Sequence, residues 1–129
     1  MDYYLNTENT FNRLLKEYKQ YQSLVVAYDF DNTVYDFHQE GHEYKDVIGL
    51  LRQLKGIGCY LIVFTANEDI DFIKEYCHEN QIPFDSVNEN PSFFTSKARK
   101  IYYNILLDDR AGLKEAYDSL TRLIKTIKP

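Results

Sequence analysis

Hydrophobic residues along the chain fall into short runs and periodic stripes, which follow one another in alternation. Short apolar runs, typical of buried strands, occupy residues 24–28, 59–64 and 105–107, and a shorter one lies near Val87. Stripes with helical spacing occupy residues 8–22, 43–55, 69–80 and 112–127, with Asn6 or Thr7 as the first helix cap. Strands that alternate with helices indicate an α/β fold with a mainly parallel sheet covered on both faces.

The pattern fits a single domain. The chain has 129 residues, of which 44% are hydrophobic and 27% charged, and it contains no repeat, low-complexity tract or linker. We assign residues 1–22 to an N-terminal packing helix, residues 24–113 to a core that carries the candidate motifs, and residues 112–127 to a C-terminal helix.

The net charge and the cysteine content limit which binding partners and which cellular compartment fit this sequence. The net charge of −5 disfavours extended nucleic acid and anionic membrane surfaces. The two cysteines, Cys59 and Cys77, indicate neither a zinc site nor a disulfide framework and fit reduced thiols in a cytoplasm. The N-terminus lacks the pattern of a secretory signal, and no apolar stretch approaches the roughly 20 residues of a membrane helix. We therefore expect a cytoplasmic protein that does not bind the membrane.

Acidic and hydroxyl residues directly follow three of the predicted strands. Asp29 and Asp31 follow the first strand, Thr65 follows the second, and Asp108 and Asp109 follow the last. In open parallel sheets, ligands bind beyond the carboxyl ends of the strands. We therefore expect these side chains to share one site.

The two carboxylates after the first strand suit attack on a phosphate ester. If the backbone stays extended, alternation directs Asp29 and Asp31 to one side. Asp29 can then attack phosphorus and form an acyl phosphate, while Asp31 protonates the leaving oxygen and later deprotonates the attacking water. The hydroxyl of Thr33 would tie the turn together.

A cation has to neutralise the phosphoryl oxygens in this chemistry, and the aspartates offer ligands for Mg²⁺. Asp29, the backbone carbonyl of Asp31, and Asp108 can form the ligand set. Asp109 would bind the metal directly or through a water molecule.

The end of the second predicted strand is suited to holding phosphate oxygens. Thr65 offers a hydroxyl group, and the amides of Ala66 and Asn67 are expected to open a helix. A lysine should offset the remaining negative charge.

These motifs, in this order, resemble those of the haloacid-dehalogenase superfamily of phosphohydrolases. The resemblance spans residues 24 to about 113 and rests on a downstream lysine and three segments: Asp29-Phe30-Asp31-Asn32-Thr33-Val34, Phe64-Thr65-Ala66-Asn67 and Asp108-Asp109. It implies a Rossmann-like three-layer sandwich, Mg²⁺ dependence and an aspartyl-phosphate intermediate. An aspartate two positions after the nucleophile is the phosphatase pattern of this family.

Two lysines lie where the resemblance implies a phosphate-stabilising lysine. Lys97 would lie in the first turn of a short helix, near the strand ends, if Thr95 or Ser96 caps such a helix. The segment that starts at Lys100 looks more like the small capless members of the family. Both lysines remain candidates.

The intervals between the motifs are too short for the cap domain that many family members insert. The site should be open, which suits a bulky phosphorylated substrate or closure by the second subunit of a homodimer. Residues 35–43 would form a flap, in which His38 and His42 either contact substrate or are exposed without a role. The substrate class stays open among nucleotides, sugar phosphates, nucleic-acid ends and phosphoproteins.

Three other interpretations fit the sequence less well. A calcium loop over residues 29–40 would need glycine where Val34 stands, and a helix before it. A phosphoacceptor signalling domain would carry its phosphorylated aspartate after the third strand. The strongest alternative is a binding module that holds phosphate or a partner without turnover. Loss of Asp29 or Asp31 would mark such a module, and both residues are present. For Asn67 and Arg110, a helix cap and a local ion pair are the structural alternatives.

Overall fold

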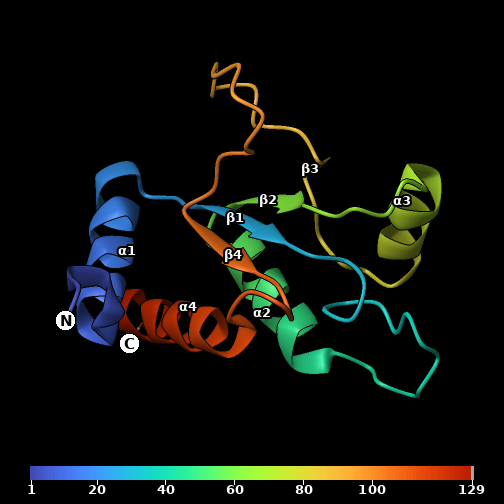
Figure 1. Cartoon of the computed structure of the whole chain (residues 1–129), viewed down its shortest axis with the longest axis horizontal. Coiled ribbons are helices and arrows are strands. Elements are labelled where there is room, and N and C mark those ends of the chain that lie inside the picture. Colours follow the sequence, from blue (N-terminus) through green and yellow to red (C-terminus); the bar gives the residue numbers. More distant parts are fainter. Residues whose placement is uncertain (129) are drawn as a thin grey trace.

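The computed structural model describes residues 1–128, in which strands and helices alternate (Figure 1). The strands are β1 (Val25–Tyr28), β2 (Tyr60–Val63), β3 (Ser86–Val87) and β4 (Ile105–Leu107). The helices are η1 (Tyr3–Leu5), α1 (Thr7–Tyr21), α2 (Lys45–Gly56), α3 (Ile70–Glu79) and α4 (Leu113–Ile127). Every strand and α-helix predicted from the hydrophobic pattern is present, with ends that differ by at most two residues.

The four strands form one parallel sheet in the order β3-β2-β1-β4. The chain moves outward from β1 through β2 to β3 and then crosses to the other side of β1 for β4. Such a reversal of strand order is where open parallel sheets bind ligands. Tyr28 pairs with Leu107 across β1 and β4, so that Asp29 and Asp108 both follow at the same edge of the sheet.

One face of the sheet packs against the helices. Side chains alternate along each strand, and Val26 and Tyr28 of β1 point to the main core. The same core contains buried residues from all four α-helices, among them Leu14, Leu51, Leu54, Ile73, Cys77, Leu120 and Leu123. Burial of this many apolar side chains in one cluster makes this face the main source of hydrophobic stabilisation.

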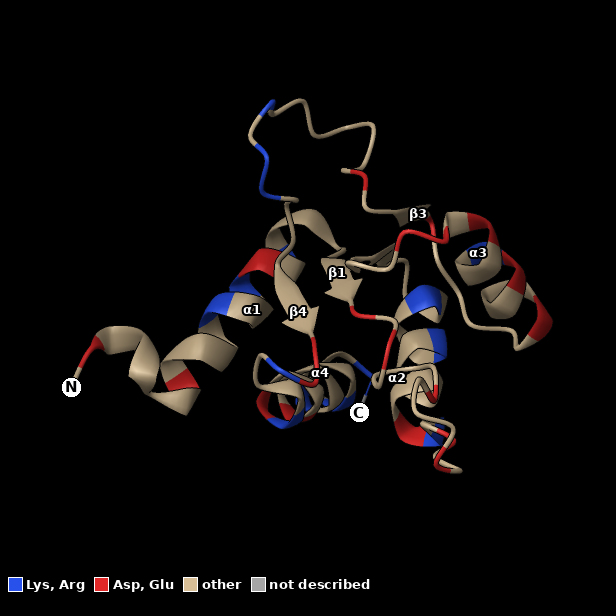
Figure 2. Cartoon of the chain, turned by 45° about the vertical axis from the view of Figure 1, so that its right-hand side comes forward, with Lys and Arg blue, Asp and Glu red and all other residues tan. Residues whose placement is uncertain are grey.

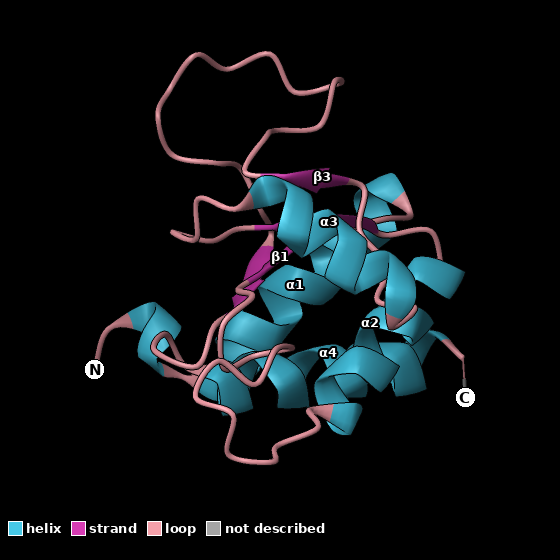
Figure 3. Cartoon of the chain, turned by 90° about the vertical axis from the view of Figure 1, so that its right-hand side faces the viewer, coloured by secondary structure: helices cyan, strands magenta, loops and turns pink. Residues whose placement is uncertain are grey.

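The opposite face is covered by the connection between β3 and β4. Val25, Ala27 and Ile62 form a second small core with side chains from residues 101–103 of that connection. Residues 88–104 form a loop over the sheet and contain no helix (Figures 1 and 3). The predicted Rossmann-like α/β sandwich with a parallel sheet is therefore confirmed, and its third layer is this loop, rich in aromatic residues.

The short helix considered at Thr95 or Ser96 does not form. The hydroxyl of Ser96 accepts a hydrogen bond from the backbone N–H of Ala98 at 3.1 Å, which is a local turn. Lys97 consequently lies on an irregular segment and not in the first turn of a helix.

No cap domain is inserted between the strands of residues 1–128. The flap expected at residues 35–43 is a turn-rich loop, in which the Asp36 carboxylate accepts hydrogen bonds from the N–H groups of Glu40, Gly41 and His42. Gly41 has a φ of 89°, a conformation that glycine adopts at little cost. His42 and the neighbouring His38 are exposed. None of the helices in the described part of the chain combines the length and the hydropathy needed to cross a membrane.

Asn104, directly before β4, joins three parts of the fold. Its side-chain oxygen accepts from the N–H of Val25 at 2.6 Å, and its own N–H donates to the carbonyl of Val25 at 2.8 Å. Its side-chain nitrogen donates to Glu17 of α1 at 2.9 Å and to the hydroxyl of Tyr102 at 3.1 Å. Asn104 therefore extends the β1–β4 ladder and ties it to α1 and the covering loop.

We predict that Asn104→Ala lowers the free energy of unfolding by about 1–3 kcal/mol, because the N–H of Val25 loses its partner in a partly buried position. Urea unfolding at neutral pH measures the change. Asn12→Ala, at an exposed position of α1, is the matched control and should change stability by less than about 0.5 kcal/mol. Equal stabilities for the two variants would contradict this role of Asn104.

Candidate active site

Three aspartates meet where β1 and β4 end. The N–H of Asp29 donates to the carbonyl of Leu107 at 2.9 Å, which continues the ladder to the residue where β1 turns away. One carboxylate oxygen from each of Asp29, Asp108 and Asp109 lies within 4.8 Å of the other two. Figure 2 shows these acidic segments at the neighbouring ends of the two strands. Oxygens at this spacing can bind one divalent cation.

The aspartates lie in a cleft of about 560 Å³ that is formed by the segments following β1, β2 and β4. Its lining consists of Asp29, Asp31, Asn32, Phe64, Thr65, Ala66, Asp108, Asp109 and Arg110. The strand ends that the sequence singles out thus converge on one cleft. Of the predicted site residues, Asn67, Lys97 and Lys100 do not line it.

The turn after β1 brings Asp31 to the same cleft as Asp29. The carbonyl of Phe30 accepts hydrogen bonds from the N–H groups of Val34 at 3.1 Å and Tyr35 at 3.0 Å, which closes a tight turn. Within residues 1–128, the Asp31 Oδ1 atom is buried and has no hydrogen-bond partner. A buried carboxylate oxygen without a partner is costly, so this atom indicates a ligand or a proton at that point.

Thr33 links the turn after β1 to the end of β4. Its side chain is completely buried. Its hydroxyl lies 3.3 Å from Asp109 Oδ1, to which it donates, and 3.3 Å from the N–H of Asp109, from which it accepts. The hydroxyl was expected to tie its own turn together, and it instead positions Asp109 beside Asp29.

Asn88, which follows β3, holds the end of β2 and is not among the predicted site residues. Its side-chain oxygen accepts from the N–H of Thr65 at 2.8 Å, and its side-chain nitrogen donates to the carbonyl of Thr65 at 2.9 Å. Asn88 has a φ of 55°, a region that asparagine tolerates better than most residues. An asparagine after a short strand is a turn signal, but its pairing with Thr65 depends on the β2–β3 register.

The predicted helix start at Ala66 and Asn67 is wrong. Helix α3 begins at Ile70, with Asp69 as its cap. The N–H of Asn67 donates to the hydroxyl of Thr65 at 3.1 Å, and the Asn67 side chain accepts from the N–H of Asp69 at 2.9 Å. Asn67 is therefore not a helix cap, and its backbone N–H is already bonded to Thr65 and not free to bind phosphate. Thr65 and Ala66 do line the cleft.

Both candidate lysines lie on the loop that covers the second face of the sheet. Lys97 and Lys100 are exposed, and the amino group of Lys100 lies 5.6 Å from the centre of the Tyr103 ring. Figure 2 shows the basic part of this loop projecting away from the acidic strand ends. Among the described residues that line the cleft, Arg110 is the cationic one.

Burial and neighbouring carboxylates raise the pKa values of the two aspartates after β1. Partial burial, followed by the charges of Asp108 and Asp109, raises the pKa of Asp29 from 3.8 to about 7. Burial also raises the pKa of Asp31, with a further contribution from Asp109, and the Asn67 side chain and His38 oppose this shift. A bound cation would relieve the repulsion among these groups.

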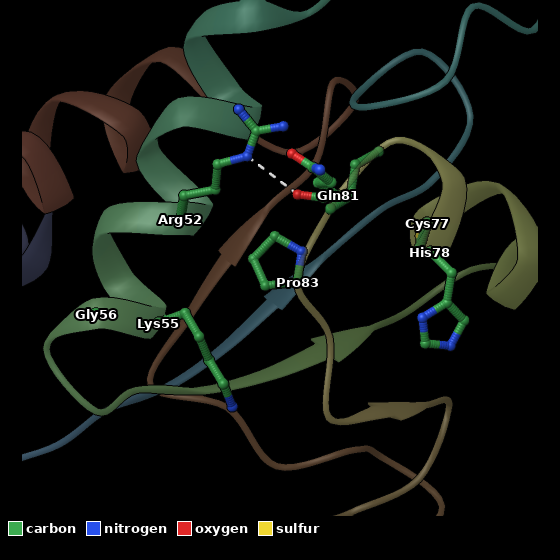
Figure 4. A pocket seen from close by; sticks show the side chains of 8 residues that line it. Arg52, Lys55, Gly56, Cys77, His78, Gln81 and Pro83 are labelled. Atoms are coloured by element: carbon green, nitrogen blue, oxygen red, sulfur yellow. Dashed lines mark hydrogen bonds between the residues drawn. The ribbon is translucent and has the colours of Figure 1, made fainter.

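A second cavity lies between α2 and the segment that follows α3, and the cationic side chains that line it are paired (Figure 4). Its volume is about 490 Å³. The guanidinium of Arg52 donates to the carbonyls of Gln81 at 3.0 Å and Asn80 at 3.1 Å, and Lys55 pairs with Asp85. These cations fix α2 to the neighbouring turn and strand, so we treat this cavity as structural.

Comparisons with known proteins support the fold and give no information on the activity. No family model and no curated protein matches the sequence. A solved structure of a conserved protein from Bacteroides thetaiotaomicron is similar, with a TM-score of 0.65 and 24% sequence identity over 83% of this chain and 93% of that one. At this identity the similarity shows the α/β fold alone.

We predict that Asp29→Asn stabilises the metal-free protein at alkaline pH. The pKa of Asp29 in the folded state, about 7, lies above its ordinary value of 3.8. The folded state therefore binds more protons between these values, and stability is lost as the pH rises through this range. The amide removes that loss, so we expect a gain of about 1–2 kcal/mol near pH 8, allowing for partial exposure, and almost none near pH 4.

Urea unfolding in EDTA at the two pH values measures this effect. Asp2→Asn, at an exposed position of the N-terminus, is the control and should have no pH-dependent effect. A gain for Asp29→Asn that is equal at both pH values would show that carboxylate repulsion is not its cause.

Proposed function

We propose that this protein is a Mg²⁺-dependent phosphatase that hydrolyses a phosphate monoester through Asp29. The main support is that oxygens of Asp29, Asp108 and Asp109 lie within 4.8 Å of one another at the reversal of strand order. The unpartnered, buried oxygen of Asp31 belongs to the same cleft. The resemblance to the haloacid-dehalogenase superfamily supports the same assignment.

The donor set fits magnesium. All the candidate ligands are carboxylate oxygens, which suit a hard cation, and their mutual repulsion favours binding of positive charge. Asp29, Asp108 and Asp109 would hold the ion, together with the backbone carbonyl of Asp31. When bound, Mg²⁺ supplies positive charge that offsets the phosphoryl oxygens.

The residues of the cleft account for both halves of the hydrolysis. A carboxylate oxygen of Asp29 forms a bond to phosphorus while the bond from phosphorus to the ester oxygen breaks, and Asp31 gives its proton to that leaving oxygen. Water then attacks the aspartyl phosphate and gives a proton to Asp31, and the bond between Asp29 and phosphorus breaks. One ester and one water are consumed, and one alcohol and one inorganic phosphate are released.

The cleft also contains groups that can hold the phosphate. The hydroxyl of Thr65 accepts from the N–H of Asn67, so its own hydrogen is available to a phosphoryl oxygen. Asn88 holds the backbone of Thr65 through hydrogen bonds to both its N–H and its carbonyl. The open cleft, with no cap domain in residues 1–128, favours a bulky phosphorylated substrate or cover by a second subunit. The buried, free thiols of Cys59 and Cys77 agree with a cytoplasmic setting.

One observation favours the alternative, a module that binds phosphate or a partner without turnover. The resemblance implies a lysine beside the transferred phosphate, and neither Lys97 nor Lys100 is among the cleft-lining residues. Both aspartates required for turnover line the cleft, which is why we propose the enzyme first.

We predict that Asp29→Asn abolishes phosphate release, since an amide cannot replace the nucleophile, and that Asp31→Asn slows it by about 10²–10⁴-fold. The assay measures phosphate released from an aryl phosphate, nucleotides and sugar phosphates, with Mg²⁺ or with EDTA. Asp118→Asn, an exposed substitution on α4, is the control and should retain full activity. Steady-state release by purified Asp29→Asn would disprove the role of Asp29, and a near-normal rate for Asp31→Asn would remove Asp31 from the mechanism.

A further inference from the structure

We propose that Arg110 binds the phosphoryl group in this cleft and takes the place of the lysine that the resemblance implies. The inference rests on the proposed function, because it assigns a phosphate to the same site. Three features of the structure support it: the charge balance of the cleft, the unpaired state of Arg110, and the route of the loop that carries the candidate lysines.

The charge balance of the cleft calls for a cation besides the metal. Four carboxylates line the cleft, from Asp29, Asp31, Asp108 and Asp109. A phosphate monoester brings up to about two further negative charges at neutral pH. One Mg²⁺ offsets only part of this charge, so a second positive group is needed for phosphate to enter. Arg110 is the cationic residue among the described residues of the cleft lining.

Arg110 is free to take this role. None of the ion pairs within residues 1–128 includes its guanidinium, so the structure does not support the alternative of a local ion pair. Its backbone is nevertheless fixed, because its N–H donates to Asp108 Oδ1 at 2.9 Å. The N–H of Ala111 donates to the carbonyl of Asp108 at 2.9 Å and closes the turn. The guanidinium of Arg110 is exposed, and its planar shape, on a residue two positions after the candidate metal ligand Asp108, is suited to bidentate binding of phosphate.

The route of residues 88–104 explains why a lysine from this connection does not fill the role. Side chains from residues 101–103 pack against the second face of the sheet, in the core of Val25, Ala27 and Ile62. The exposed segment before them, with Lys97 and Lys100, projects from that face and away from the strand ends (Figures 1 and 2). Without a helix in this connection, no element directs a lysine to the cleft.

Binding of inorganic phosphate in the presence of Mg²⁺, measured by titration calorimetry, tests the inference without requiring turnover. We expect Arg110→Ala to raise the dissociation constant of inorganic phosphate by about 10- to 100-fold, as for the loss of a charged hydrogen-bonding partner. Arg110→Lys should recover part of the affinity. Arg99→Ala, which removes an exposed arginine of the loop, should bind phosphate as the wild type does. Mg²⁺ affinity without phosphate should not fall in any of the variants, which excludes damage to the aspartates.

The same titrations on Lys97→Ala and Lys100→Ala compare the rival cations directly. Unchanged phosphate affinity in Arg110→Ala, or a larger loss in either lysine variant, would overturn the inference, and so would a wild type that binds no phosphate. If the wild type binds phosphate through Arg110 but hydrolyses no ester, the proposed catalysis fails and this inference stands. If Asp29-dependent hydrolysis occurs while Arg110→Ala matches the wild type in phosphate binding and in kcat/KM, the proposed catalysis stands and this inference fails.

Discussion

The repulsion among Asp29, Asp108 and Asp109 is the constraint on which the candidate site depends. Charges about 4–5 Å apart near a protein surface repel by roughly 3–4 kcal/mol per pair. The fold opposes this repulsion with short-range contacts: the hydrogen bond from Asp29 to Leu107 and the two bonds between Thr33 and Asp109. Unfavourable charge held in place by packing and hydrogen bonds is typical of a site that binds a cation.

The sheet order and the loop over its second face together determine which other groups reach that site. Because β1 is central, the cleft collects residues from the ends of β1, β2 and β4. Because the β3–β4 connection is a loop and not a helix, its cations stay outside the cleft, and Arg110, which directly follows the aspartates of β4, provides the positive charge within it. The distribution of charge at the site thus follows from the path of the backbone.

Much of this could be predicted from the sequence because the signals are local. Polar residues follow the buried strands directly or after one further residue, and parallel pairing brings those strand ends to one edge, which placed Asp29, Asp31, Thr65 and both aspartates of β4 in one cleft. The contacts of Thr33 and Asn88 join segments far apart in the chain, so no local pattern reveals them. The helix start at Ala66 was wrongly predicted because the Thr65 hydroxyl takes the N–H of Asn67 in a local turn, and the Asp69 side chain caps the helix further on by accepting from the N–H of Phe72.

A crystal structure of the protein grown with Mg²⁺ and beryllofluoride would test the central claim most directly. Beryllofluoride binds a nucleophilic carboxylate as a mimic of its phosphorylated form. We expect it on a carboxylate oxygen of Asp29, with Mg²⁺ bound by Asp29 and Asp108 in the same cleft. Mg²⁺ held by the aspartates with no adduct on Asp29, or an adduct on another residue, would contradict the proposal that Asp29 is the nucleophile.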